Sequence, residues 1–121
     1  MAKTVLIIDD SKAIRDMVAF TLQPHGYQIV TAADGAEGLT KLRSDQPALI
    51  ITDLNMPVMN GIEFIRNARK DAAGAGVPIV MLTTETKPEL KAEGKSAGAT
   101  GWINKPFDAE MLLNVAKKLA G

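Results

Sequence analysis

Five short runs of apolar residues recur along the chain, separated by stretches in which apolar residues are spaced differently. The runs begin near Val5, Gln28, Ala48, Val77 and Thr100. Short apolar runs bounded by turn-forming residues are typical of β-strands. Between the runs, apolar residues recur three and four positions apart, as on one helix face; one such set is Ile14, Met17, Val18 and Leu22. The pattern predicts five successive β-α units.

The composition of the runs predicts where each strand lies in the sheet. Residues 5–8, 48–51 and 78–82 are apolar almost throughout, as expected for central strands that are buried on both faces. Residues 28–32 and 100–103 are more mixed, which places them at the edges. Strict alternation of strands and helices implies a parallel sheet with helices on both faces. We therefore expect an α/β fold with a doubly wound five-stranded parallel sheet in the order 2-1-3-4-5.

Helix start signals agree with this division. Asp34 with Glu37, and Thr86 with Glu89, have the spacing of a capping box. We therefore expect the fourth helix over residues 86–96, capped by Thr86.

The composition excludes several classes of function. Fourteen basic and fourteen acidic residues cancel, so the chain lacks the positive charge that nucleic-acid and membrane-surface binding require. The absence of cysteine excludes disulfides, thiolate chemistry and zinc sites built on sulfur. No run has the length of a signal peptide or a membrane span. We expect a soluble cytoplasmic protein with one domain over residues 1–121.

Acidic residues directly follow two of the predicted central strands. Asp9 and Asp10 follow the first strand and Asp53 follows the third, and ligands bind between these two strands in this sheet order. Two like charges 4 Å apart repel by about 4 kcal/mol at an effective dielectric of 20, so the cluster needs a cation. Mg²⁺ prefers such oxygen ligands, and the sequence predicts a magnesium site here. Taken singly, one aspartate of the pair could cap the helix near Ser11, and Asp53 could form a turn.

Thr83 and Lys105 follow the fourth and fifth strands. Asp53 is the best nucleophile candidate, because a carboxylate can attack phosphorus to give an aspartyl phosphate. Phosphoryl transfer depends mainly on charge neutralisation, which the Lys105 ammonium and Mg²⁺ would supply. The Thr83 hydroxyl could donate to a phosphoryl oxygen. The alternatives are a solvated surface lysine and a threonine that forms a local turn bond.

The chain resembles the receiver domains of response regulators, in particular single-domain chemotaxis regulators. The matching segments are VLIIDDS, DLNMPVMNG, TTE and KPF, which begin at residues 5, 53, 83 and 105. The resemblance covers the whole chain and implies a flavodoxin-like (βα)5 fold. It also implies that Asp53 takes a phosphoryl group from a histidine kinase, which would be CheA-like in chemotaxis.

The resemblance implies roles for the metal-binding positions. Asp10, Asp53 and the backbone carbonyl of Asn55 match direct Mg²⁺ ligands, and Asp9 matches a residue that acts largely through water. Asn55 and Glu85 match the two positions that tune how fast the aspartyl phosphate hydrolyses.

Thr83 and Lys105 match the hydroxyl and ammonium that bind the phosphoryl group. Trp102 occupies the place of a switch aromatic, more often Tyr or Phe, that turns inward as the threonine moves toward the phosphate. The alternative is that Trp102 is a fixed plug on an edge strand. Thr84 stands where relatives often have a smaller residue, which would narrow access to Asp53. The resemblance also implies a cis peptide bond before Pro106.

These expectations combine into a phosphorylation-driven switch. Phosphorylation would change the affinity of the fourth helix, fifth strand and fifth helix for a protein such as the flagellar motor switch. We expect a monomer without an output domain, whose only catalysis is its own phosphorylation and autodephosphorylation. A phosphate sink or a phosphorelay intermediate would show the same sequence motifs.

The main alternative from another class is a phosphatase or phosphotransferase with an aspartyl intermediate. Haloacid-dehalogenase-like enzymes place the nucleophile on the first strand in an Asp-x-Asp pattern and carry a substrate-covering insert. Here Asp9 and Asp10 are adjacent, Asp53 follows the third strand, and no insert is present. A flavin carrier is disfavoured because the turn after the first strand lacks a small, hydroxyl-rich loop for a phosphate, and no Walker glycine loop occurs.

Overall fold

Five β-strands alternate with five α-helices, as the apolar pattern predicts. The structure is a computed structural model and describes residues 3–121. The strands are β1 (Thr4–Ile8), β2 (Gln28–Ala32), β3 (Leu49–Thr52), β4 (Ile79–Thr83) and β5 (Gly101–Asn104). The helices are α1 (Lys12–Leu22), α2 (Gly35–Asp45), α3 (Gly61–Lys70), α4 (Pro88–Ala97) and α5 (Ala109–Ala120), and a short 3-10 helix, η1 (Gln23–His25), follows α1.

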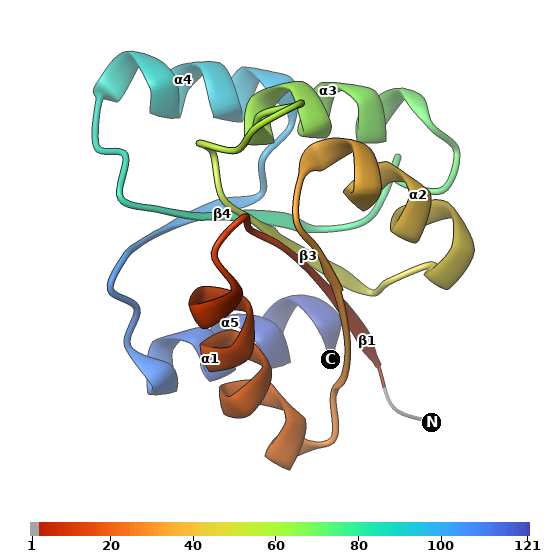
Figure 1. Cartoon of the computed structure of the whole chain (residues 1–121), viewed down its shortest axis with the longest axis vertical. Coiled ribbons are helices and arrows are strands. Elements are labelled where there is room, and N and C mark those ends of the chain that lie inside the picture. The colour runs from red at the N-terminus through yellow and green to blue at the C-terminus, as the bar shows by residue number, and fades with distance from the viewer. Residues whose placement is uncertain (1–2) are drawn as a thin grey trace.

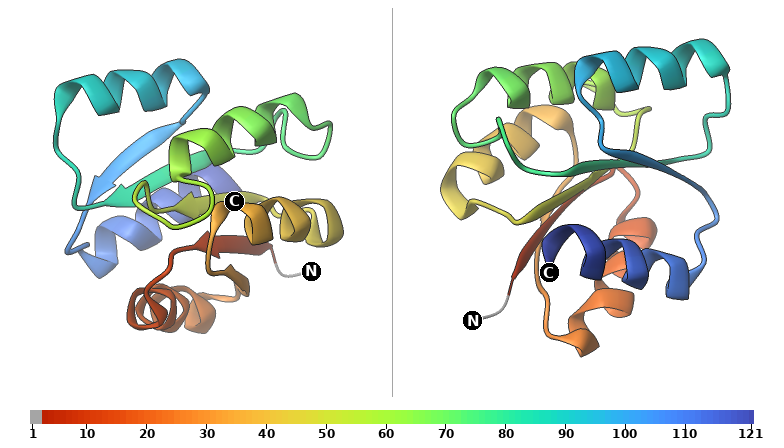
Figure 2. Two further views of the ribbon diagram at one scale, coloured as in Figure 1. Left: turned by 45° about the horizontal axis from the view of Figure 1, so that its top comes forward. Right: turned by 180° about the vertical axis from the view of Figure 1, so that it is seen from behind.

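The strands form one parallel sheet in the order β2-β1-β3-β4-β5, which confirms the predicted order. Helices α1 and α5 cover one face of the sheet, and α2, α3 and α4 cover the other (Figures 1 and 2). The α/β class and the doubly wound arrangement are therefore as expected. In the part of the chain that the structure describes, no helix is both long enough and apolar enough to cross a membrane.

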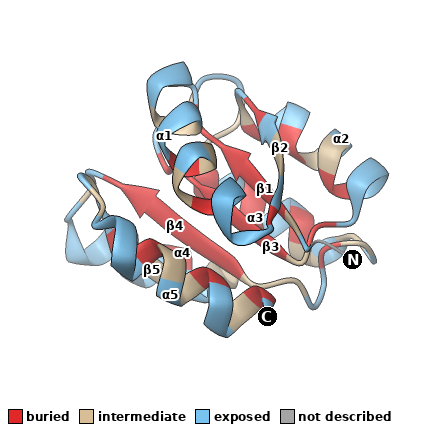
Figure 3. Ribbon diagram, turned by 90° about the horizontal axis from the view of Figure 1, so that it is seen from below, coloured by how far each residue is buried: buried red, intermediate tan, exposed pale blue. Residues whose placement is uncertain are grey.

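The core has two parts, one on each face of the sheet. Alternate residues of a strand point to opposite faces, so Val5 and Ile7 pack with α1 and α5, whereas Leu6 and Ile8 pack with the other three helices. Every residue of β3 and β4 is buried, while β2 and β5 contain exposed positions (Figure 3). The mixed composition of the edge strands thus reflects their partial exposure.

The N-terminus of α2 has half of the predicted capping box. The Asp34 side chain accepts a hydrogen bond from the N–H of Glu37 at 2.8 Å, but the Glu37 carboxylate accepts from the N–H of Ala33 instead of Asp34. A complete capping box lies at the start of α3, between Asn60 and Glu63, where we did not predict one.

The predicted start of α4 is wrong. The helix begins at Pro88 with Lys87 as its N-cap, and Thr86 does not cap it. The carboxylate of Glu85 accepts the N–H groups of Thr86 and Lys87, which precede the helix, and among residues 3–121 no side chain caps α4. Pro88 suits the first helical position, because the N–H that it lacks would have no partner within the helix.

Candidate functional site

The sheet register brings two aspartates together at the carboxyl ends of the central strands. Ile8 of β1 is paired with Thr52 of β3, so the residues that follow them, Asp9 and Asp53, emerge side by side. The N–H of Asp53 donates to the carbonyl of Ile8 at 2.9 Å and continues the ladder past the last paired residues. The convergence predicted from the strand pattern is confirmed.

Three carboxylates form one cluster at this place. Asp9, Asp10 and Asp53 each offer an oxygen, and these oxygens all lie within 4.8 Å of one another. Asp9 and Asp53 are buried, whereas Asp10 is exposed. Neither residue of the Asp9-Asp10 pair caps α1. Ser11 is the N-cap, and Asp9 Oδ1 accepts the N–H of Ser11 at 2.9 Å.

The Lys105 ammonium is bound to two of these carboxylates. Its Nζ lies 2.8 Å from Oδ2 of Asp9 and 3.0 Å from Oδ2 of Asp53. The side chain is only 12% exposed, so the alternative of a solvated surface lysine is wrong. The N–H of Lys105 donates to the carbonyl of Thr83 at 3.0 Å, which fixes the residue at the end of β5. The Lys105-Pro106 peptide bond is cis, as the resemblance implies.

Burial and charge have opposite effects on the pKa values of Lys105 and Asp9. Burial alone would lower the pKa of Lys105, but its hydrogen bonds and charge interactions with Asp9 and Asp53 outweigh burial and raise the pKa. Burial raises the pKa of Asp9, and the hydrogen bond from Lys105 offsets only part of that effect. The lysine is therefore held as a cation at the centre of the site.

The remaining predicted residues surround this centre. Thr83 is buried at the end of β4, and its hydroxyl accepts the N–H of Glu85 at 3.2 Å, which is the local turn bond considered above. Asn55 and Thr84 are exposed in the loops after β3 and β4. Glu85 is half-buried. None of these four side chains contacts the carboxylates by a hydrogen bond among residues 3–121.

Trp102 lies on β5, on the sheet face that α4 covers. It is half-buried and packs against the core cluster of that face. Its register partner on β4 is Met81, two residues before Thr83. The ring is therefore held inward in this structure, next to the strand that carries the threonine.

Two residues near the site were not predicted. Arg15 on α1 donates from Nη1 to the backbone carbonyl of Asp9, and it thereby braces the loop that carries Asp9 and Asp10. Gly61 packs so closely on the backbone of Asp53 that a methyl group here would collide with the Asp53 carbonyl. An arginine on a helix gives no sequence signal for such a contact. The Asn60-Gly61 pair at the start of α3 gives only a turn signal in the sequence.

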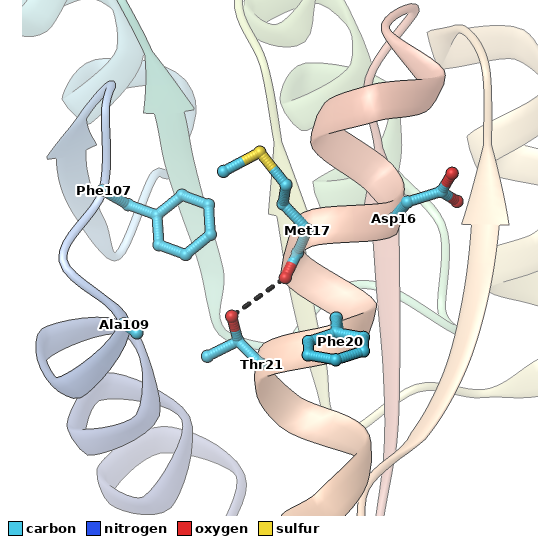
Figure 4. A pocket seen from close by; sticks show the side chains of 6 residues that line it. All are labelled: Asp16, Met17, Phe20, Thr21, Phe107 and Ala109. Carbon is cyan, nitrogen blue, oxygen red and sulfur yellow. Dashed lines mark hydrogen bonds between the residues drawn. The ribbon is translucent and has the colours of Figure 1, made fainter.

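An apolar groove of about 450 Å³ lies between α1 and the start of α5. Figure 4 shows its lining side chains. Its lining residues are Asp16, Met17, Phe20, Thr21, Phe107 and Ala109. Phe20 is 83% exposed and Met17 is 51% exposed, which is unusual for large apolar side chains. One lining residue, Phe107, follows Lys105 by two positions in the sequence.

The donor set fits a hard divalent cation. Mg²⁺ binds oxygen at about 2.1 Å, so two oxygens on one ion lie up to about 4.2 Å apart. The three carboxylates are already close to that separation. Small side-chain adjustments would therefore suffice to bind Mg²⁺.

Acidic side chains and one largely buried lysine meet at the carboxyl ends of the first, third and fifth strands of a doubly wound sheet. This arrangement defines a class of phosphoacceptor signalling domains. The chain belongs to the response regulator receiver domain family, whose family model matches residues 5–117. It is thus a receiver domain of two-component response regulators, as the sequence motifs suggest.

Individual relatives come from several signalling systems. The chemotaxis protein CheY4 of Vibrio cholerae is 50% identical, with a TM-score of 0.93 and coverage of 98% of this chain and 99% of that one. Protein PilH of Pseudomonas aeruginosa is 34% identical over 109 residues, which are 90% of each chain. The phosphate regulon transcriptional regulatory protein PhoB of Escherichia coli is 34% identical over 113 residues, which cover 93% of this chain and 49% of PhoB. The chain therefore spans about half the length of PhoB.

Proposed function

We propose that the chain is a phosphorylation switch, in which Asp53 accepts a phosphoryl group from a histidine kinase of the CheA type. One observation carries this proposal: Lys105 holds its ammonium 3.0 Å from the buried carboxylate of Asp53, in the cluster with Asp9 and Asp10. A carboxylate with a cation beside it, and two further carboxylates for a metal, suits phosphoryl transfer from a donor that carries a reactive phosphate.

In the transfer step, a carboxylate oxygen of Asp53 attacks the phosphorus of a phosphohistidine. The new P–O bond forms as the P–N bond breaks, and the electron pair of the P–N bond remains on the departing imidazole. Asp10, Asp53 and the Asn55 carbonyl would hold Mg²⁺ directly, with Asp9 acting largely through water. When bound, the ion neutralises charge on the phosphoryl oxygens. Lys105 contributes a second positive charge and orients the Asp53 carboxylate.

The phosphorylated form would draw Thr83 toward the site. In the present structure its hydroxyl accepts the N–H of Glu85. A phosphoryl oxygen offers that hydroxyl a charged acceptor, and hydrogen bonds to charged groups are stronger than neutral ones. Movement of Thr83 would free further space on the α4 side of the sheet, where the ring of Trp102, the proposed switch aromatic, already packs. Asn55 lies in the loop after β3 and Glu85 in the loop after β4. From these positions they would tune how fast the aspartyl phosphate hydrolyses.

The groove between α1 and α5 supports a protein as the phosphodonor. A donor histidine must reach Asp53, so its carrier must cover the rim that includes the groove. Exposed Phe20 and Met17 offer apolar contact area to that carrier. We therefore assign this groove to the histidine kinase.

We assign the output surface to α4, β5 and α5, which would bind a target protein. The relationship to the chemotaxis protein CheY4 supports the flagellar motor switch as the target. The relatives also include PilH and the phosphate regulon regulator PhoB, and a phosphate sink or phosphorelay role is the alternative. We place the protein in the cytoplasm as a monomer, where ATP-dependent kinases operate. We propose that it turns over no substrate besides its own phosphoryl group, and that it binds no nucleic acid or membrane.

Labelling with acetyl phosphate and Mg²⁺ tests the phosphoacceptor. The unaltered chain should gain one phosphoryl group by mass spectrometry, and Asp53→Asn should abolish this gain because an amide is not a nucleophile here. Asp16→Asn is the matched control, since Asp16 is an exposed carboxylate on α1. Labelling of the Asp53→Asn variant at the unaltered rate would defeat the proposal. Repeated turnover of a small phosphate ester by the unaltered chain would favour the phosphatase alternative.

A further inference from the structure

Gly94 occupies a buried position in the interior of α4. Glycine lowers helix stability relative to alanine, because it loses more backbone freedom on folding. A glycine at a buried helical position therefore calls for a reason in the packing around it.

The reason is the ring of Trp102. A methyl group on Gly94 would lie 3.1 Å from Cζ3 of Trp102 and 3.8 Å from Cε of Met81. The first distance is shorter than an ordinary van der Waals contact, so the ring or the helix would have to give way by a few tenths of an ångström. Since Met81 and Trp102 are register partners on β4 and β5, the ring is confined between the sheet and α4. The missing side chain at position 94 leaves a notch that admits the second ring of the indole.

Two further contacts act on the same ring in opposite directions. The Lys91 ammonium lies 5.7 Å from the ring centroid, within the range of a cation–π interaction that favours the inward position. The indole Nε1 is buried and has no hydrogen-bond partner; among residues 3–121 it is the only buried side-chain nitrogen or oxygen in this state. An unpaired buried donor is unfavourable, and outward movement into water would satisfy it. The inward ring is thus balanced between favourable packing and an unmet hydrogen bond.

We propose that Gly94 is the positioning residue for Trp102: its missing side chain admits the indole to the notch and so sets the balance between inward and outward ring positions. The same contact fixes how closely α4 lies against β5. A side chain at position 94 shifts the balance outward, where Nε1 reaches water. This inference relies on the proposed function only for its consequence, namely that α4 and β5 form part of the surface that the target binds.

The single tryptophan of the chain makes the proposal measurable without phosphorylation. Gly94→Ala should shift the fluorescence emission to longer wavelength and increase quenching by acrylamide, because the ring becomes more exposed. Ala92→Gly is the matched control, since Ala92 is an exposed residue of the same helix. It should lower the melting temperature and leave the emission unchanged.

A stability comparison separates steric conflict from helix propensity. Gly94→Ala should lower the melting temperature in the Trp102 background and raise it in a Trp102→Tyr background, because the phenol lacks the second ring. If Gly94→Ala fails to fold alone but folds with Trp102→Tyr, the conflict is confirmed. Unchanged emission together with an equal rise in melting temperature in both backgrounds would overturn the proposal.

Labelling by acetyl phosphate keeps this inference apart from the proposed function. Gly94 lies outside the carboxylate cluster, so Gly94→Ala should still acquire a phosphoryl group on Asp53. Absence of labelling in the unaltered chain would count against the proposed function alone. The fluorescence and stability results would still decide the role of Gly94.

Discussion

The Nζ atom of Lys105 lies 3.0 Å from Oδ2 of Asp53, although 52 positions separate the two residues in the sequence. The same atom lies 2.8 Å from Oδ2 of Asp9, which is 96 positions away. One cation thus joins the ends of the first, third and fifth strands. Its removal leaves two buried carboxylates facing each other without a counter-charge.

Lys105→Ala should therefore destabilise the protein. Removal of one partner from a buried ion pair is strongly unfavourable, and we expect a loss of roughly 3 kcal/mol in the free energy of unfolding at neutral pH. Lys12→Ala is the matched control, because its ion pair with Asp16 is exposed and contributes about 0.5 kcal/mol or less. Urea denaturation measures both values. Added Mg²⁺ should reduce the loss in Lys105→Ala, since the variant keeps the carboxylates that would bind the ion.

The same Lys105→Ala variant tests the signalling role. It should bind Mg²⁺ broadly as the unaltered chain does, but phosphorylation should no longer alter binding to the target. Full-strength signalling by this variant would show that Lys105 has another role.

Gly61→Ala should disturb the phosphoacceptor through the backbone. The added methyl group would collide with the Asp53 carbonyl, and overpacking of this kind costs roughly 1–3 kcal/mol. We expect lower stability and slower labelling of Asp53 by acetyl phosphate. Gly76→Ala is the matched control, because nothing lies within 4 Å of the methyl group that it adds. Equal behaviour of the two variants would refute a close contact between Gly61 and Asp53.

Phe20→Ser tests the groove as the kinase surface. The side chain is 83% exposed, so its loss should leave the fold unchanged. Phosphotransfer from the kinase should slow by about tenfold, which corresponds to about 1.4 kcal/mol of lost contact energy. Labelling by acetyl phosphate should keep its rate, because a small donor needs no docking surface. Met111→Ser serves as the control, since Met111 is an exposed apolar residue of α5 outside this groove.

The ion pair between Arg43 and Asp71 predicts a pH dependence of stability. Arg43 Nε lies 2.7 Å from Asp71 Oδ2, and this hydrogen bond, with that from the N–H of Ala73, lowers the pKa of Asp71 in the folded protein. At pH values between the lowered pKa and the ordinary one, the unfolded chain binds more protons than the folded one, so stability rises with pH. The contribution is complete above the ordinary pKa and disappears as the pH falls through the folded-state pKa.

Arg43→Gln should therefore lower the melting temperature at pH 7 and have a smaller effect near pH 3. Melting curves of both proteins over this range measure the difference. A difference that grew on acidification would contradict the assigned direction.

The order of the sheet and the residues at the centre of the site could be predicted because both follow from the apolar pattern of the strands. The continuous apolar character of residues 48–51 placed β3 in the middle of the sheet, and parallel strands then had to present Asp9 and Asp53 at one edge. The place of Lys105 directly after the last run supplied the cation. For these residues, position along a strand determines position in space.

The start of α4 and the contacts of Arg15 could not be predicted in the same way. Thr86 has the right spacing for a cap, but Pro88 occupies the first helical position, so Lys87 instead of Thr86 becomes the N-cap. Arg15 is one of many cations on helices, and only the fold determines that its guanidinium meets the Asp9 carbonyl. The need for glycine at position 94 likewise depends on a ring that lies on another element.

Strand β5 is four residues long, with Trp102 in its second position and Lys105 directly after its last. The ring that packs on α4 and the ammonium that pairs with Asp53 therefore share one rigid stretch of backbone at the rim of the sheet. A shift in the backbone of β5 would displace the Trp102 ring and the Lys105 ammonium together. Substitutions on the flanking helices, in contrast, would change the proposed target surface without displacing the Lys105 ammonium from Asp53.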